Sequence, residues 1–90
     1  MREIDVSPLG GGAFRVTVTG TETTTHRVTI PQGMLEDLGL DGVTPDAVIR
    51  ESFAFLLERE PNTSILPDFS LDVIARYFPE YPQDLLRRLG

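Results

Sequence analysis

The sequence feature that most constrains the fold is the segment TPDAVIRESFAFLLERE, which spans residues 44–60. Thr44 is placed as an N-cap, Pro45 suits the first helical position, and Pro61 ends the run, so the segment predicts a single helix. On a helical wheel its apolar side chains cover an arc of about 200°, which is wider than one contact with a sheet requires. We therefore expect this helix to be covered on two sides.

Two arrangements would cover such a wide apolar face. The C-terminal segments of the same chain could pack on it, or a second subunit could, and the pattern favours neither. Because a chain of 90 residues buries only a modest core, a partner would add usefully to its stability. We therefore expect a homodimer that uses this face. The candidate interface residues are Val48, Ser52, Phe53, Phe55 and Leu56.

Polar and apolar residues alternate before this helix, which predicts a sheet. The alternation covers residues 3–7, 13–19 and 25–30. Pro8 and the glycines after it end the first strand, and a short loop after Gly20 makes a hairpin of the second and third.

Residues 31–90 are predicted to be helical around the long segment. Pro31 begins a short helix over residues 32–38. Asp68 or Ser70 caps a later helix, and a last helix runs from about Pro82. The predicted fold class is thus α+β, with a three-stranded antiparallel sheet (β-β-β) followed by three or four helices. We expect a single domain over residues 1–90, with the sheet in 1–30 and the helical part in 31–90.

The charge is unevenly distributed along the chain. Residues 31–90 hold five arginines against eleven carboxylates and carry the whole net charge of −6, whereas residues 1–30 are neutral. Neutralisation of phosphates supplies most non-specific affinity for nucleic acids. The charge therefore disfavours nucleic-acid binding by the helical part and leaves residues 1–30 as its only candidate.

The composition excludes several kinds of site. The absence of cysteine rules out disulfides, thiolate metal sites and cysteine nucleophiles. No apolar run reaches the roughly 18–20 residues that span a bilayer, and no signal peptide is evident. We expect a cytoplasmic protein without membrane contact, and no motif implies a cofactor.

An enzyme or metal site would depend on His26, the one histidine. It shares a strand face with Val28 and Ile30, which favours a packed or edge histidine over a catalytic or metal-binding one. No serine or carboxylate has a spacing that selects it as a partner for His26. We therefore predict a protein that is not an enzyme, without catalytic or metal-binding residues. A small hydrolase or metal protein is the remaining alternative.

The segment RYFPEYP, residues 76–82, is the most distinctive aromatic stretch. Tyr77, Phe78 and Tyr81 could form an aromatic interaction patch, because aromatic residues are enriched at interface cores. The sequence favours the other interpretation, in which they seal the end of the core with the tyrosine hydroxyls reaching solvent.

Residues 25–60 resemble the ribbon-helix-helix family of DNA-binding regulators and antitoxins. The resemblance lies in the strand THRVTI, the helix around QGMLEDL and the segment TPDAVIRESFAFLLERE. In that family, strands from two subunits pair and insert side chains into the major groove. The resemblance implies DNA contacts by Thr25, Arg27 and Thr29.

The function predicted from the sequence is protein binding by a small acidic homodimer. The alternative is a ribbon-helix-helix-like transcriptional regulator or antitoxin. An acidic antitoxin would also use its negative half to hold a basic, toxin-like protein partner.

Overall fold

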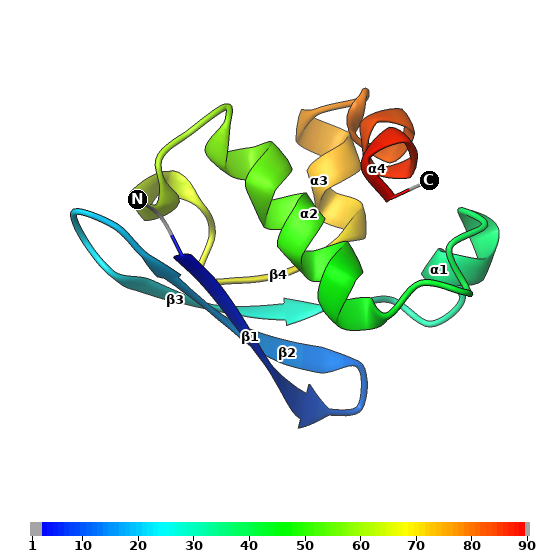
Figure 1. Cartoon of the computed structure of the whole chain (residues 1–90), viewed down its shortest axis with the longest axis horizontal. Helices are drawn as coiled ribbons and strands as arrows, with labels where there is room; N and C mark the ends of the chain where they lie inside the picture. Colours follow the sequence, from blue (N-terminus) through cyan, green and yellow to red (C-terminus); the bar gives the residue numbers. More distant parts are fainter. Residues whose placement is uncertain (1–2, 90) are drawn as a thin grey trace.

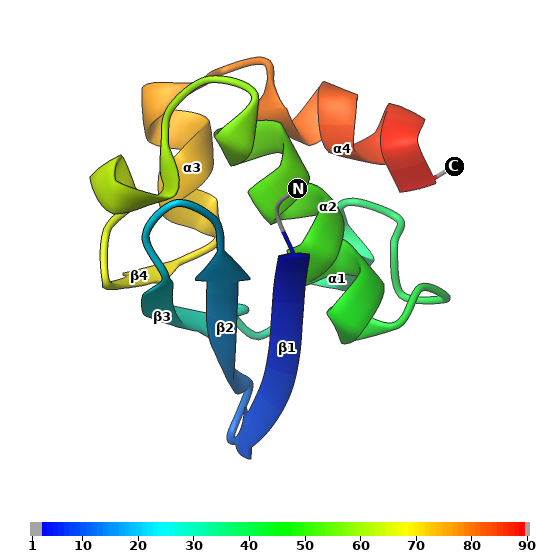
Figure 2. The same ribbon diagram turned by 60° about the vertical axis from the view of Figure 1, so that its left-hand side comes forward.

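The computed structural model describes residues 3–89 and shows a sheet with helices packed on one face (Figures 1 and 2). Helices α2 and α3 lie next to the sheet, and α4 packs on both of them. The α+β class is therefore confirmed. The elements in chain order are β1 (Glu3–Gly10), β2 (Ala13–Thr19), β3 (Thr24–Thr29), α1 (Met34–Asp37), α2 (Pro45–Leu57), the 3₁₀ turn η1 (Asn62–Ser64), β4 (Asp68–Ser70), α3 (Asp72–Tyr77) and α4 (Tyr81–Leu89).

The sheet has four strands in the order β1-β2-β3-β4, so the prediction of three strands is wrong by one. β1, β2 and β3 pair antiparallel, as predicted. β4 pairs parallel to β3, with Arg27 opposite Asp68 and Thr29 opposite Ser70, which makes the sheet mixed. Parallel neighbours need a long crossover connection, and α2 lies within it. Three residues are too few to show the alternation that reveals a strand.

Two predicted element boundaries are also corrected. β1 continues through Pro8 to Gly10 because it lies at the edge of the sheet, where a missing N–H is tolerated. Asp68 and Ser70, predicted as helix caps, belong to β4 instead. The N-cap of α3 is Leu71, which makes no side-chain capping bond.

The start of α2 is confirmed in detail. The Thr44 hydroxyl accepts a hydrogen bond from the Ala47 amide at 3.3 Å, and Pro45 is the first helical residue. The preceding α1 is shorter than predicted. Gly33 stands at its N-cap with a φ of 85°, a left-handed conformation that favours glycine. Between residues 3 and 89, no helix combines the length and apolar character needed to cross a bilayer.

The two sides of α2 are buried against different parts of the same chain. On the sheet side, the Phe53 ring lies 5.4 Å from His26 and 6.0 Å from Phe69, measured between centroids. On the other side, the Phe55 ring packs edge-on against Tyr81 at 5.3 Å. The wide apolar face is thus covered by the sheet and by the C-terminal helices, which is one of the two arrangements considered from the sequence.

A buried hydrogen bond joins α2 to α4. The Ser52 hydroxyl donates to the Val48 carbonyl at 2.7 Å and lies 2.7 Å from the Tyr81 hydroxyl. Because a serine has one proton to donate, Tyr81 must be the donor in the second bond. Burial raises the pKa of Tyr81 to about 12, so this phenol stays protonated at neutral pH.

The Ser52–Tyr81 pair predicts an asymmetric response to truncation. Ser52→Ala leaves the buried Tyr81 hydroxyl without a partner and should lower the free energy of unfolding by about 1–3 kcal/mol. Tyr81→Phe leaves Ser52 bonded to Val48 and should cost only about 0.5–1.5 kcal/mol. Urea unfolding of both single variants and the double variant would measure this coupling, and additive effects would contradict it.

Candidate functional site

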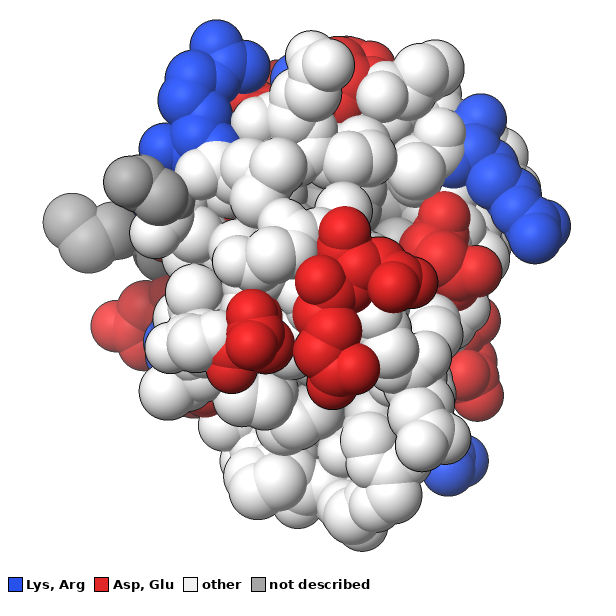
Figure 3. All heavy atoms as spheres, turned by 90° about the vertical axis from the view of Figure 1, so that its right-hand side faces the viewer, with Lys and Arg blue, Asp and Glu red and all other residues white. Residues whose placement is uncertain are grey.

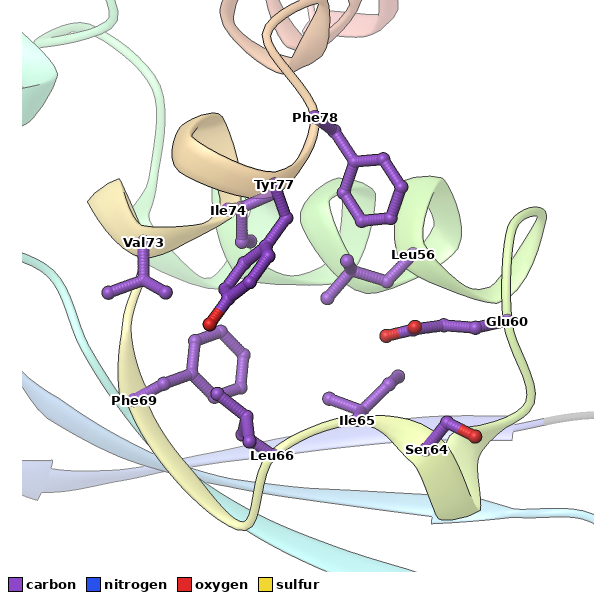
Figure 4. A pocket seen from close by; sticks show the side chains of 10 residues that line it. All are labelled: Leu56, Glu60, Ser64, Ile65, Leu66, Phe69, Val73, Ile74, Tyr77 and Phe78. Carbon is purple, nitrogen blue, oxygen red and sulfur yellow. The ribbon is translucent and has the colours of Figure 1, made fainter.

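A hydrophobic groove opens between the C-terminal end of α2, the segment that follows it, and α3 (Figure 4). Its volume is about 280 Å³. Leu66 and Tyr77 border it with 47% and 68% of their surfaces exposed, which is unusual for large side chains beside a concave apolar surface. The lining residues are Leu56, Glu60, Ser64, Ile65, Leu66, Phe69, Val73, Ile74, Tyr77 and Phe78.

One wall of the groove is the segment at residues 61–67, which is tied to the sheet by buried polar side chains. The Asn62 side-chain amide donates to the Glu22 carbonyl at 2.8 Å and to the Thr24 hydroxyl at 2.9 Å. The backbone amide of Arg27 donates to the Pro67 carbonyl at 2.8 Å. Both ends of the wall are therefore fixed by hydrogen bonds.

His26 completes this attachment from inside the core. Its Nδ1 lies 2.8 Å from the Leu66 carbonyl oxygen, and its Nε2 lies 2.8 Å from the Thr24 hydroxyl. A carbonyl can only accept, so in this arrangement Nδ1 carries the proton. With Nδ1 as the donor, an unprotonated Nε2 accepts the Thr24 hydroxyl proton, and every member of the chain of hydrogen bonds from Asn62 to Leu66 then has a partner.

The opposite wall is formed by α3 and Phe78. Ile74 is buried and anchors α3 to the core. The Arg59 guanidinium lies 3.5 Å from the centre of the Phe55 ring and 5.8 Å from that of Phe78. Its Nε also lies 3.4 Å from a Glu80 carboxylate oxygen. Stacking and charge together hold this wall against α2.

Polar groups stand at both ends of the apolar floor (Figure 4). Glu60 extends toward the middle of the groove between Phe78 and Ile65, while the Tyr77 hydroxyl lies over Phe69. Across residues 3–89, the Glu60 carboxylate has no ion pair or hydrogen bond. The groove therefore combines an apolar surface with one unpaired negative charge.

The predicted interface residues of α2 are placed inside the protein. Val48, Ser52, Phe53 and Phe55 are fully buried, and Leu56 is 4% exposed. Their assignment to a contact with a second subunit is wrong, because the sheet and α4 already cover them. Only Leu56 reaches a candidate site, where it lines the groove.

The predicted aromatic patch is divided between two environments. Tyr77 and Phe78 line the groove, but Tyr81, the first residue of α4, is fully buried with its hydroxyl bonded to Ser52. The patch is therefore wrong as a set of three residues. Tyr77 and Phe78 instead line the groove, together with residues that lie outside the aromatic motif.

The candidate DNA-contacting residues lie on the sheet face that the helices leave uncovered. Thr25 and Arg27 are exposed, and Thr29 is partly exposed. Their strand pairs within the chain with β2, as the hairpin pattern predicted, and over residues 27–29 also with β4. Arg15 stands directly opposite Arg27, and neither guanidinium forms an ion pair within the described residues.

His26 is 2% exposed, so its prediction as a packed histidine is confirmed. Both ring nitrogens are engaged by Thr24 and Leu66. Within residues 3–89, no three potential metal-ligating side chains lie together. The one histidine serves the groove indirectly, by holding Leu66.

Several groove residues had no functional signal in the sequence. Glu60 lies at the end of a helical pattern, and Phe69 lies in a strand that was not predicted. The one available hint was Leu66, a large apolar residue in a loop bounded by Pro61 and Pro67.

Replacement of His26 tests whether it holds the groove wall. His26→Phe keeps an aromatic ring but leaves the Leu66 carbonyl without its side-chain donor and the Thr24 hydroxyl proton without an acceptor, so the free energy of unfolding should fall by on the order of 2 kcal/mol or more. The Arg27 amide should also exchange its proton faster. Thr25→Ala, an exposed change on the same strand, is the control, and equal effects of the two changes would contradict the assigned role.

Comparisons with protein-family models, with curated proteins and with solved structures found no match for this chain.

Proposed function

We propose that the chain is a non-enzymatic protein-binding domain that holds a segment of a partner protein in the groove. The observation that supports this proposal is the exposure of Leu66 and Tyr77 on either side of an apolar floor. An apolar concave surface bordered by polar groups is the usual form of a binding site.

The size of the groove favours a peptide side chain as its occupant. Pockets for drug-sized ligands have volumes of roughly 300–1,000 Å³. At about 280 Å³, this groove suits one or two apolar side chains. An amphipathic helix that lays its apolar face into a hydrophobic groove is a recurring mode of peptide recognition.

The rigidity of the walls also favours binding. Hydrogen bonds fix the segment at residues 61–67, and the buried Ile74 fixes α3. A preformed site spends little conformational entropy when a ligand enters. The backbone of Leu66 is thus fixed while its side chain stays available.

Selection from a display library of random peptides, panned on the immobilised full chain, tests this function. We expect enriched peptides to carry large apolar side chains and to lose at least about tenfold in affinity on Leu66→Ser, because truncation of a central anchor commonly has this effect. The matched control is Leu9→Ser, since Leu9 is 44% exposed on the β1–β2 hairpin, away from the groove.

Both leucines are exposed, so neither change should alter the free energy of unfolding by more than about 0.5 kcal/mol. Peptides that bind the wild-type and Leu66→Ser chains equally would place the binding site elsewhere. A failure to enrich any peptide would reject the proposed function.

Nucleic-acid binding by the uncovered sheet face is the second candidate function. It is favoured by the direct opposition of Arg15 and Arg27, since like charges at paired positions destabilise a sheet unless something neutralises them. Phosphate groups would do so. Asp68, beside Arg27 on β4, opposes such binding.

For this second function, Arg27→Ala should abolish salt-sensitive binding of duplex DNA without lowering the melting temperature, because the side chain is exposed and faces a like charge on Arg15. The control is Arg76→Ala, which removes an exposed arginine from α3. Fluorescence anisotropy at several salt concentrations provides the measurement. An absence of binding by the wild-type chain at low salt would exclude this function.

A further inference from the structure

We infer that the segment bound in the groove carries a basic side chain, Arg or Lys, which pairs with Glu60 while a neighbouring apolar side chain lies between Leu66 and Phe78. This inference rests on the proposed function and specifies the chemistry of the partner. It starts from the position of Glu60, whose unpaired carboxylate extends into an apolar groove (Figure 4). A partly buried carboxylate is best stabilised by a charged hydrogen-bond donor.

Within residues 3–89, no arginine is paired with Glu60. Four of the five arginines in residues 31–90 already form ion pairs: Arg50 with Asp46, Arg59 with Glu80 and Glu58, Arg87 with Asp84, and Arg88 with Asp84, Glu51 and Glu58. The fifth, Arg76, is exposed and forms no ion pair within the described residues, Glu60 included. The Glu60 carboxylate is therefore available to a cation that a partner supplies.

The net charge of the helical part favours the same partner. The helical part carries the whole net charge of −6. Figure 3, which views the side of the molecule where α1 lies, shows carboxylates gathered at its centre and arginines at its margins. Glu36 and Asp37 on α1 and Asp41 after it are exposed, and all three lie outside the groove lining. A basic segment is attracted by this excess, whereas an acidic one is repelled.

Among residues 3–89, Arg76 is the one arginine beside the groove that could favour an acidic segment over a basic one. It precedes Tyr77 on α3 and is exposed beside the groove wall. Helical spacing places it on the solvent side of Val73, away from the buried Ile74. Arg76 is not among the residues that line the groove, whereas Glu60 is.

A charge-reversal experiment with the selected peptides tests the inference. Each peptide is made with its basic residues retained, changed to Gln, or changed to Glu, and is titrated against the wild-type, Glu60→Gln and Glu60→Arg chains. On the wild-type chain, we expect the Glu form to bind at least about tenfold more weakly than the basic form. Glu60→Gln should reduce this difference, and Glu60→Arg should reverse the order.

The matched control is Glu36→Arg, which makes the same change in net charge on α1, outside the groove lining. It should leave the order of the three peptide forms unchanged. An order that is insensitive to Glu60 in peptides that still require Leu66 would overturn the pairing while leaving the proposed function intact. Loss of dependence on Leu66 would instead reject the function.

Two further outcomes would also overturn the inference. Enriched peptides could be acidic and depend on Arg76, as shown by weaker binding to Arg76→Ala. Light scattering could show self-association of the wild-type chain that Leu66→Ser abolishes, in which case the occupant is a second copy of this chain. Thermal unfolding of each variant confirms that it is folded.

Discussion

The rest of the structure depends on the burial of α2 on two sides. Phe53 packs toward the sheet, and Phe55 packs toward Tyr81 on α4, so a single helix forms the centre of three layers. A helix with one apolar stripe would need only the sheet. Because α2 is apolar on both sides, the C-terminal segments must return over it, and their return creates the space between the end of α2 and α3 that becomes the groove.

Polar groups inside the core then determine where the walls of that space lie. An all-apolar contact would permit the segment at residues 61–67 to slide along the sheet, whereas His26 and Asn62 each require particular partners. Buried polar groups that are fully satisfied favour one arrangement over its neighbours. The same bonds that fix the backbone of Leu66 leave its side chain in solvent. The hydrogen bonds that fix the arrangement of the core are thus also the ones that hold the Leu66 side chain exposed at the groove.

Local chemistry could be predicted from the sequence, and long-range pairing could not. The Thr44 cap and the hairpin of β2 and β3 depend on residues close together in the chain, and both were predicted correctly. β4 pairs with residues about forty positions earlier and is too short to show a pattern. Most of the groove walls depend on that pairing, so Leu66 and Phe69 had no visible role. The wide face of α2 indicated a second covering layer, but helical periodicity cannot distinguish the chain's own helices from those of a second subunit.

The two candidate binding surfaces lie on different parts of a molecule whose charge is segregated. Arg15 and Arg27 lie on the open sheet face, while the helical part holds the excess of carboxylates. Such a distribution acts on a partner before contact, because it extends about a Debye length, roughly 8–10 Å at physiological salt. A basic segment is therefore drawn toward the helices, where Glu60 is the carboxylate that lines the apolar groove. Long-range attraction brings a basic segment to the helical part of the molecule. The shape and charge of the groove then determine which of its side chains can bind there.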